Sequence, residues 1–136
     1  MKNYRYLQRK YMLNTYPDRE LNIIAGEGIY LIDIFGEKYL DLMTNYGVNI
    51  FGYSHSHLIQ SLTNQLQKLT ILHGSFSNDR RAEAAKSLVK RCGGGLAQVY
   101  FSNSGSEAVE ASLKFAVLAT GKMKFISCRS CYHGKT

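Results

Sequence analysis

Long hydrophobic runs are absent from this sequence of 136 residues. No apolar stretch approaches the roughly 18 to 20 residues that a helix needs to cross a bilayer, so we expect no membrane-spanning helix. The opening segment, MKNYRYLQRKYMLN, lacks the apolar core that a secretory signal requires. With 45% apolar and 20% charged residues, the composition also excludes a disordered chain. We therefore expect a globular polypeptide in the cytoplasm.

Cysteine is scarce. Cys92, Cys128 and Cys131 are too few and too late in the sequence to cross-link a small secreted fold, so we expect reduced thiols. The pair Cys128-x-x-Cys131, with His133 nearby, has the spacing of half a zinc site. A structural zinc site needs four ligands, and no second pair follows. We therefore predict no metal site.

Acidic residues are fewer than basic ones, 10 against 17, which gives a formal charge of +7. Such a charge is compatible with nucleic acid, a membrane surface or an anionic small molecule as partner. The basic residues are spread along the chain among apolar ones, and no stripe of Arg and Lys alternates with exposed aromatics. We therefore predict no nucleic-acid partner and no membrane partner.

Residues 21–43 carry the alternation of apolar and polar side chains that is typical of β-strands. The predicted strands are NIIA, GIYLID and YLDLM, with a turn at FGEK. Strands this closely spaced form a hairpin or a small meander. The next segment, TNYGVNIFGYSHSH, is rich in Gly, Asn and His and has no sustained period, so we predict a loop.

Two helices are predicted after this loop. From Ser56, apolar residues recur at spacings of three and four over about four turns. They are Leu58, Ile59, Leu62, Leu66 and Leu69. A second helix is predicted from Asp79 to about Arg91, with Asn78 as its N-cap and three glycines at 93–95 that end it.

A strand–helix–strand pattern follows. LAQVYF reads as a buried strand, a turn at 102–106 leads into a helix from Glu107 to about Thr120, and MKFIS reads as a second strand. This pattern is typical of a βαβ unit, so we predict an α/β fold with a parallel sheet covered by helices. A parallel pair of strands alone buries too little surface. We therefore expect the chain to be a fragment of a larger protein.

The turn from Asn103 to Glu107 is the candidate site for chemistry. Gly105 lets the backbone approach an anion closely, the serine hydroxyls add donors, and the start of a helix favours negative charge. A phosphate group would fit there. The alternative is a capping box between Ser104 and Glu107, which many helices carry without any ligand and which the spacing alone favours.

The same residues carry a family resemblance. FSNSGSEAVEASLKFA, followed by YHGKT, resembles the cofactor-phosphate turn and the ring-stacking segment of class III pyridoxal-phosphate-dependent aminotransferases of the acetylornithine, ornithine and putrescine type. Further matches lie upstream in the family's order. They are NTYPDREL, GEGIYLIDIFGEKYLDL, VNIFG with His55, and HGSFSNDRRAEAAKSLV. The resemblance covers 14–136 and identifies the chain as similar to the N-terminal portion of that family.

The resemblance implies a fold-type I pyridoxal-phosphate transferase, an α/β fold with a small β element and a large α/β domain. Residues 1–55 would form an N-terminal arm and the small β-meander. Residues 56–136 would begin the large cofactor-binding domain, with its mainly parallel sheet incomplete. The implied activity is transfer of an amino group from an ornithine-, acetylornithine- or diamine-like donor to a 2-oxo acid. For the full-length protein it implies a homodimer.

The resemblance also assigns site residues. The phosphate of pyridoxal 5'-phosphate would be bound at Gly105 and Ser106, with Ser104 beside them. The ring of Tyr132 would stack on the pyridine ring of the cofactor, and His133 would support that segment. We predict these as the cofactor-binding residues.

Lys135 departs from the acetylornithine type, which carries Arg at that position. A lysine cannot form the bidentate clamp that arginine makes with a carboxylate. Lysine there is similar to the putrescine type, which favours a diamine, ornithine or another ω-amino donor, with Lys135 as a substrate contact. A second departure is GYSHSH, which lacks the proline of the family's Gly-His-x-His-Pro segment.

The catalytic groups of the family lie beyond the length of this chain. They are the lysine that binds the cofactor aldehyde and the carboxylate on the pyridine nitrogen. The lysines present here do not match that motif, so we predict no catalytic residue in this chain and no activity for the 136-residue chain alone. Two alternatives are a short non-catalytic binding or dimerisation module and one half of a split enzyme.

Overall fold

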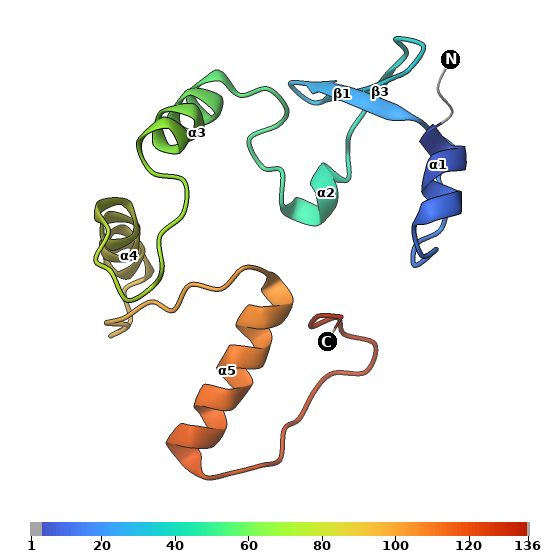
Figure 1. Cartoon of the computed structure of the whole chain (residues 1–136). Helices are drawn as coiled ribbons and strands as arrows, with labels where there is room; N and C mark the ends of the chain where they lie inside the picture. The colour runs from blue at the N-terminus through green and yellow to red at the C-terminus, as the bar shows by residue number, and fades with distance from the viewer. Residues whose placement is uncertain (1–3, 136) are drawn as a thin grey trace. The chain divides into compact units, whose positions relative to one another are not determined.

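The computed structural model describes residues 4–135 (Figure 1). The chain divides into two compact units, Met1–Leu72 and His73–Thr136. Within the described residues, no helix combines the length and the apolar character that crossing a membrane demands.

A three-stranded antiparallel meander forms the centre of the first unit (Figure 1). Its strands are β1 (Ile23–Glu27), β2 (Tyr30–Asp33) and β3 (Lys38–Leu40), in the order β1-β2-β3. Glu27 pairs with Tyr30, so the first connection has only two residues. The first of them, Gly28, has φ +56°, a conformation that glycine adopts without strain. The predicted meander is confirmed.

A single carboxylate organises the turn between β2 and β3. Oδ1 of Asp33 accepts hydrogen bonds from the amides of Phe35 and Glu37, both at 2.9 Å. Its Oδ2 accepts from the hydroxyl of Tyr39 at 3.3 Å. Asp33 is 5% exposed and is the one buried residue among those that the structure describes. Desolvation raises the pKa of Tyr39, and the negative charge of Asp33 raises it further.

Tyr53 fastens the following loop to the meander. Its backbone exchanges two hydrogen bonds with Gly28, at 2.7 and 3.1 Å. Its hydroxyl donates to Oδ2 of Asp41 at 2.6 Å, which raises the pKa of Tyr53 and lowers that of Asp41. The ring covers Gly26, where a Cβ atom would lie 2.6 Å from Cδ1 of Tyr53. Only glycine fits at that position of β1.

The predicted loop after the meander contains one helical turn, α2 (Thr44–Gly47), and this turn is left-handed. Its four residues have φ values of 46°, 51°, 58° and 82° in chain order. Left-handed backbone costs an L-residue about 1–2 kcal/mol. Local hydrogen bonds offset that cost, because Oδ1 of Asp41 accepts from the amides of Met43 and Thr44, both at 3.0 Å. The sequence pattern gave no indication of this turn.

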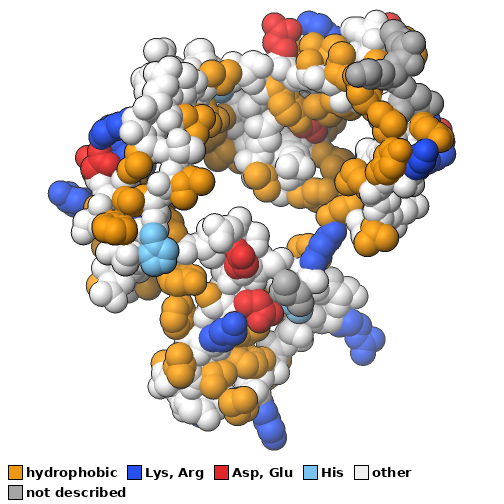
Figure 2. Space-filling view, viewed as in Figure 1, with side chains coloured by type: hydrophobic (Ala, Val, Ile, Leu, Met, Phe, Trp, Pro, Cys, Tyr) orange, Lys and Arg blue, Asp and Glu red, His pale blue; other side chains and the backbone are white. Residues whose placement is uncertain are grey.

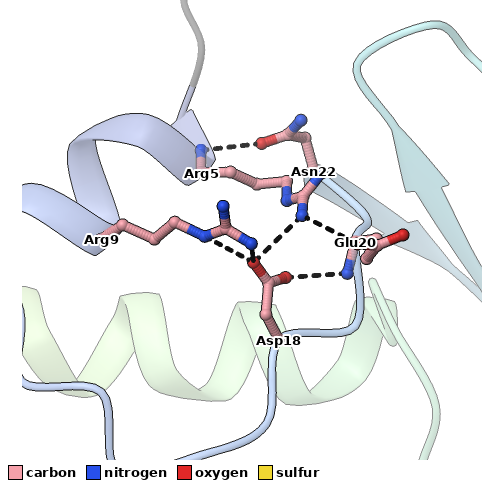
Figure 3. Close-up of polar contacts among 5 residues, drawn as sticks. All are labelled: Arg5, Arg9, Asp18, Glu20 and Asn22. Carbon is pink, nitrogen blue, oxygen red and sulfur yellow. Dashed lines mark hydrogen bonds and ion pairs between the residues drawn. The ribbon is translucent and has the colours of Figure 1, made fainter.

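The N-terminal helix α1 (Tyr4–Tyr11) is joined to the start of the meander by a polar cluster (Figure 3). Oδ2 of Asp18 lies 3.1 Å from Arg5 and 2.7 Å from Arg9. Its Oδ1 accepts from the amide of Glu20 at 2.8 Å, and the amide of Arg5 donates to Asn22 at 3.0 Å. The Glu20 amide first, and then Arg5 and Arg9, lower the pKa of Asp18 to about 2.

The three predicted helices are confirmed. Helix α3 (Ser56–Lys68) begins after His55, whose ring accepts from the amide of Leu58 at 3.4 Å. Helix α4 (Asp79–Cys92) is capped by Asn78, whose side chain accepts from the amide of Arg81 at 3.0 Å. Helix α5 (Gly105–Thr120) ends at Gly121, which is left-handed with φ +68°. In each helix the cap residue supplies a hydrogen-bond partner for a backbone group at the helix end.

The predicted strands at 96–101 and 123–127 are not formed. Within residues 4–135 the meander contains the only strands, and both predicted segments run as irregular chain. A parallel strand exists only where a neighbouring strand, contributed by distant residues, completes its hydrogen bonds. The predicted burial is also absent, since Phe101 is 45% exposed and Ile126 fully exposed. The prediction of paired strands was therefore wrong for these residues.

Hydrophobic side chains lie at the surface of many elements (orange in Figure 2). No hydrophobic residue of the described chain is buried. On α3, Leu58, Leu62 and Leu66 are 42–58% exposed, although their spacing marks them as one apolar face. The elements therefore have the amphipathic patterns of a layered fold, and their apolar faces are uncovered in this chain.

Candidate functional site

The start of α5 is fixed by a capping arrangement. The hydroxyl of Ser104 accepts from the amide of Glu107 at 3.2 Å. The Glu107 carboxylate accepts from the amide of Asn103 at 2.7 Å, one residue earlier than in the usual capping box. The capping alternative is thus present, and it engages Ser104 and Glu107.

Capping does not use the first two residues of the helix. Gly105 and Ser106 come directly after the cap, where a helix has no preceding carbonyl for the amide to donate to. The positive end of the helix dipole lies at the same place. A cap and an anion site are therefore compatible at this turn, since they use different groups.

A second segment meets the turn 29 residues further along the chain. The amide of Lys135 donates to the hydroxyl oxygen of Ser106 at 3.1 Å. Both Ser106 and the neighbouring Gly134 are half-buried, in a unit where most side chains are exposed. The structure thus brings together the two segments that the sequence analysis singled out.

Gly134 makes this approach possible. A Cβ atom there would lie 2.7 Å from Oγ of Ser106, closer than real Cβ atoms come to a neighbour, and 3.1 Å from its Cα, which is tighter than most such contacts. The φ of Gly134 is +128°, which an L-residue rarely adopts. Both observations require glycine at this position.

The other predicted site residues lie in this second segment or beside the cap. Tyr132 is 79% exposed, and His133 and the side chain of Lys135 are exposed as well. The segment leaves a turn in which the amide of Cys131 donates to the carbonyl of Cys128 at 3.4 Å. Tyr132 thus presents an exposed ring two and three residues before the residues that contact Ser106.

Sequence reasoning missed the amide of Lys135 as a partner of Ser106. It considered only the side chain of Lys135. The close pairing of a serine and a glycine depends on the path of the chain between them, which no local pattern encodes. The small residues at both positions were the one available signal.

This site has the groups that recognise a phosphate ester with an attached ring. The helix start supplies amide donors, Ser106 supplies a hydroxyl, and Tyr132 supplies an aromatic face. None of these groups moves a proton or attacks a carbonyl by itself. The arrangement is therefore suited to binding and orienting.

Comparisons with known proteins identify the family of the chain. A family model described as aminotransferase class-III matches residues 12–136. The chain is 39% identical over 129 residues to an acetylornithine aminotransferase of Archaeoglobus fulgidus, covering 95% of this chain and 34% of that protein. It is 40% identical over 124 residues to a LysW-aminoadipate semialdehyde/glutamate semialdehyde transaminase of Sulfurisphaera tokodaii, covering 91% and 32%. The chain spans about a third of the length of these curated relatives.

A solved structure is similar over nearly the whole chain. It is the adenosylmethionine-8-amino-7-oxononanoate aminotransferase of Methanocaldococcus jannaschii, with a TM-score of 0.88 and 34% sequence identity. The match covers 98% of this chain and 34% of that one. The similarity therefore includes the meander, the helices and the turn at the start of α5.

Proposed function

The chain belongs to the class-III aminotransferases, and from this premise we propose that it supplies the cofactor-phosphate and ring-stacking part of a pyridoxal-phosphate-dependent aminotransferase. Its fold is the N-terminal part of a fold-type I transferase of the α/β class. The whole protein would transfer an amino group from an ornithine-, acetylornithine- or diamine-like donor to a 2-oxo acid. Members of the class are pyridoxal-phosphate enzymes, which identifies the cofactor to test first.

The residues at the start of α5 fit the phosphate of this cofactor. The amides of Gly105 and Ser106 and the hydroxyl of Ser106 would bind the phosphate oxygens, while Ser104 keeps the helix start in shape through its cap. The ring of Tyr132 would lie against the pyridine ring, with His133 supporting the segment. When bound, the cofactor supplies an aldehyde and an electron-withdrawing ring. This chain's own residues hold and orient it.

The substrate side of the proposal rests on Lys135. A lysine cannot form the bidentate clamp that arginine makes with a carboxylate, and lysine at this position is similar to the putrescine type of the family. That resemblance favours ornithine or a diamine over acetylornithine as the amino donor. The whole protein would act as a homodimer in the cytoplasm, and the chain alone would be inactive.

The observation that supports the proposal most is the hydrogen bond from Lys135 to Ser106, because it joins the phosphate turn to the ring-stacking segment. The test is a turnover assay of the whole protein loaded with pyridoxal phosphate. Ornithine, acetylornithine and putrescine are each paired with 2-oxoglutarate, and glutamate formation is measured. We expect turnover, fastest with ornithine or putrescine.

Cofactor binding is measured separately, by absorbance during titration of the whole protein with pyridoxal phosphate. Tyr132→Ala should weaken binding, and Tyr132→Phe, which keeps a ring face, should retain it. Binding without turnover of any donor would retain the cofactor site and overturn the proposed substrates. No binding at all would overturn the proposed function.

A further inference from the structure

The hydroxyl of Ser106 can form more hydrogen bonds than the one it makes with the amide of Lys135. A serine hydroxyl donates one hydrogen bond and accepts up to two. In the structure its oxygen accepts from the amide of Lys135 at 3.1 Å. The hydroxyl proton therefore points elsewhere, and a bound phosphate oxygen at the start of α5 is a suitable acceptor for it. One side chain can serve both partners at the same time.

The contact is held by shape as well as by the hydrogen bond. Gly134 lies so close to Ser106 that a Cβ atom would come within 3.0 Å of the serine Cβ. Both residues are half-buried, whereas Tyr132, His133 and the rest of Lys135 are exposed. Ser106 is thus contacted by both Gly134 and the amide of Lys135. The position of the segment relative to the helix therefore depends strongly on Ser106.

We propose that Ser106 is a positioning residue that couples anion binding at the start of α5 to the placement of residues 132–135. When its hydroxyl donates to a phosphate oxygen, its oxygen becomes a stronger acceptor for the amide of Lys135, because hydrogen bonds in a chain polarise one another. Phosphate then holds the segment that carries Tyr132 in place. The identity of the anion as the cofactor's phosphate rests on the proposed function, but the coupling itself does not.

The test uses the whole protein without cofactor and amide hydrogen exchange read at Lys135. Ser106→Ala should speed exchange at Lys135 about fivefold or more, because it removes the acceptor. Ser106→Thr keeps the hydroxyl and should restore slow exchange. Ser112→Ala is the matched control, since it removes a serine hydroxyl of the same helix that donates to the carbonyl of Val109 and lies outside the turn. It should leave exchange at Lys135 within about twofold of the unchanged protein.

Coupling is tested by adding inorganic phosphate as the probe. Phosphate should slow exchange at Lys135 in the unchanged protein and in Ser106→Thr, and should have no such effect in Ser106→Ala. Gly134→Ala separates the two partners of Ser106, because it displaces the segment and leaves the hydroxyl in place. That variant should bind inorganic phosphate as before and lose exchange protection at Lys135.

Two results would overturn the proposal. One is unchanged exchange at Lys135 in Ser106→Ala. The other is equal slowing by phosphate with and without the hydroxyl. These outcomes are distinct from failure of the proposed function, which would appear as absent binding of pyridoxal phosphate by the unchanged protein. If the cofactor binds and exchange at Lys135 does not depend on Ser106, the proposed function is retained and the proposed coupling is wrong.

Discussion

The meander of β1, β2 and β3 and the region from 93 to 135 differ in where their hydrogen-bond partners come from. In the meander, strands pair with their immediate neighbours in the sequence, and Asp33 and Asp41 hold the adjoining turns. In the second region, α5 is complete, but the segments on either side of it have no strand partner among residues 4–135. The difference teaches that an apolar pattern alone does not form a strand. A strand also needs a partner strand nearby, whereas a helix completes most of its own hydrogen bonds.

The largest expected effect is at Gly26, because the meander has no room for a side chain at this position beside Tyr53. Gly26→Ala puts a Cβ atom against the Tyr53 ring, 2.8 Å from its Cβ, so strand and loop must separate. Overpacking of this kind costs up to about 3 kcal/mol. We expect that loss in the free energy of unfolding of the whole protein, measured by urea denaturation.

The control is the pair with Tyr53→Gly, because an alanine at 53 would keep the Cβ atom that lies 2.8 Å from the added one. If the clash is the cause, Gly26→Ala adds no further loss once this side chain is gone, although Tyr53→Gly itself removes the hydrogen bond to Asp41. Additive losses of unfolding free energy in the double variant would mean that the alanine destabilises β1 itself, without any clash with residue 53. The stability of the meander would then not depend on its contact with the loop.

A second expected effect is at Asp33, whose carboxylate serves three donors. Asp33→Ala leaves the amides of Phe35 and Glu37 without their acceptor in a half-buried turn and should cost about 2 kcal/mol. Asp33→Asn keeps the side-chain oxygen that accepts from both amides and changes only the group facing Tyr39. It should therefore lose less than half as much. Equal losses in urea denaturation for the two variants would contradict this account of the turn.

Much of the fold could be predicted because its signals are local. Asn78 and Ser104 each cap a helix where the sequence placed a cap, and the meander follows the alternation of its residues. The prediction of strands at 96–101 and 123–127 was wrong for this chain, since the partners of such strands are not near them in sequence. The left-handed turn at 44–47 was missed because Asp41 and the chain path, rather than residue preference, stabilise it.

For the candidate site, the sequence and the resemblance pointed to both segments but not to their contact. Serines, a glycine and a helix start indicate an anion site at 104–106. The approach of Gly134 to Ser106 is a tertiary contact between residues far apart in sequence, and such contacts have no periodic signature. The assigned roles of Tyr132 and His133 stay predictions until binding is measured.

A third prediction concerns the region from 93 to 135. There the cap of α5 supplies a local hydrogen-bond partner, although the segments on either side of the helix have no strand partner. Ser104→Ala removes the acceptor for the amide of Glu107 and should cost about 1 kcal/mol, since caps contribute about that much. Exchange at Glu107 should quicken about fivefold. Ser102→Ala is the control, because its hydroxyl donates to the carbonyl of Ser104 and caps no amide. Faster exchange at Glu107 in the control would show that the whole turn, rather than the cap, had loosened.

The smallest expected effect sharpens the comparison at the N-terminal arm, where exposed charges rather than paired strands join α1 to the rest of the unit (Figure 3). The folded-state pKa of Asp18 is lowered from 3.8 to about 2, so its contribution to holding the arm is complete above about pH 4 and is lost as the pH falls through about 2. Pepsin, which works in this range, should therefore cut between α1 and β1 faster as the pH falls from 4 to 2, relative to a peptide of the same sequence. In Asp18→Asn the relative rate should be high at both pH values, and in the unchanged protein added salt should raise it, because salt screens exposed pairs. A rate in the unchanged protein that does not vary with pH would mean that the bond from the Arg5 amide to Asn22 holds the arm alone.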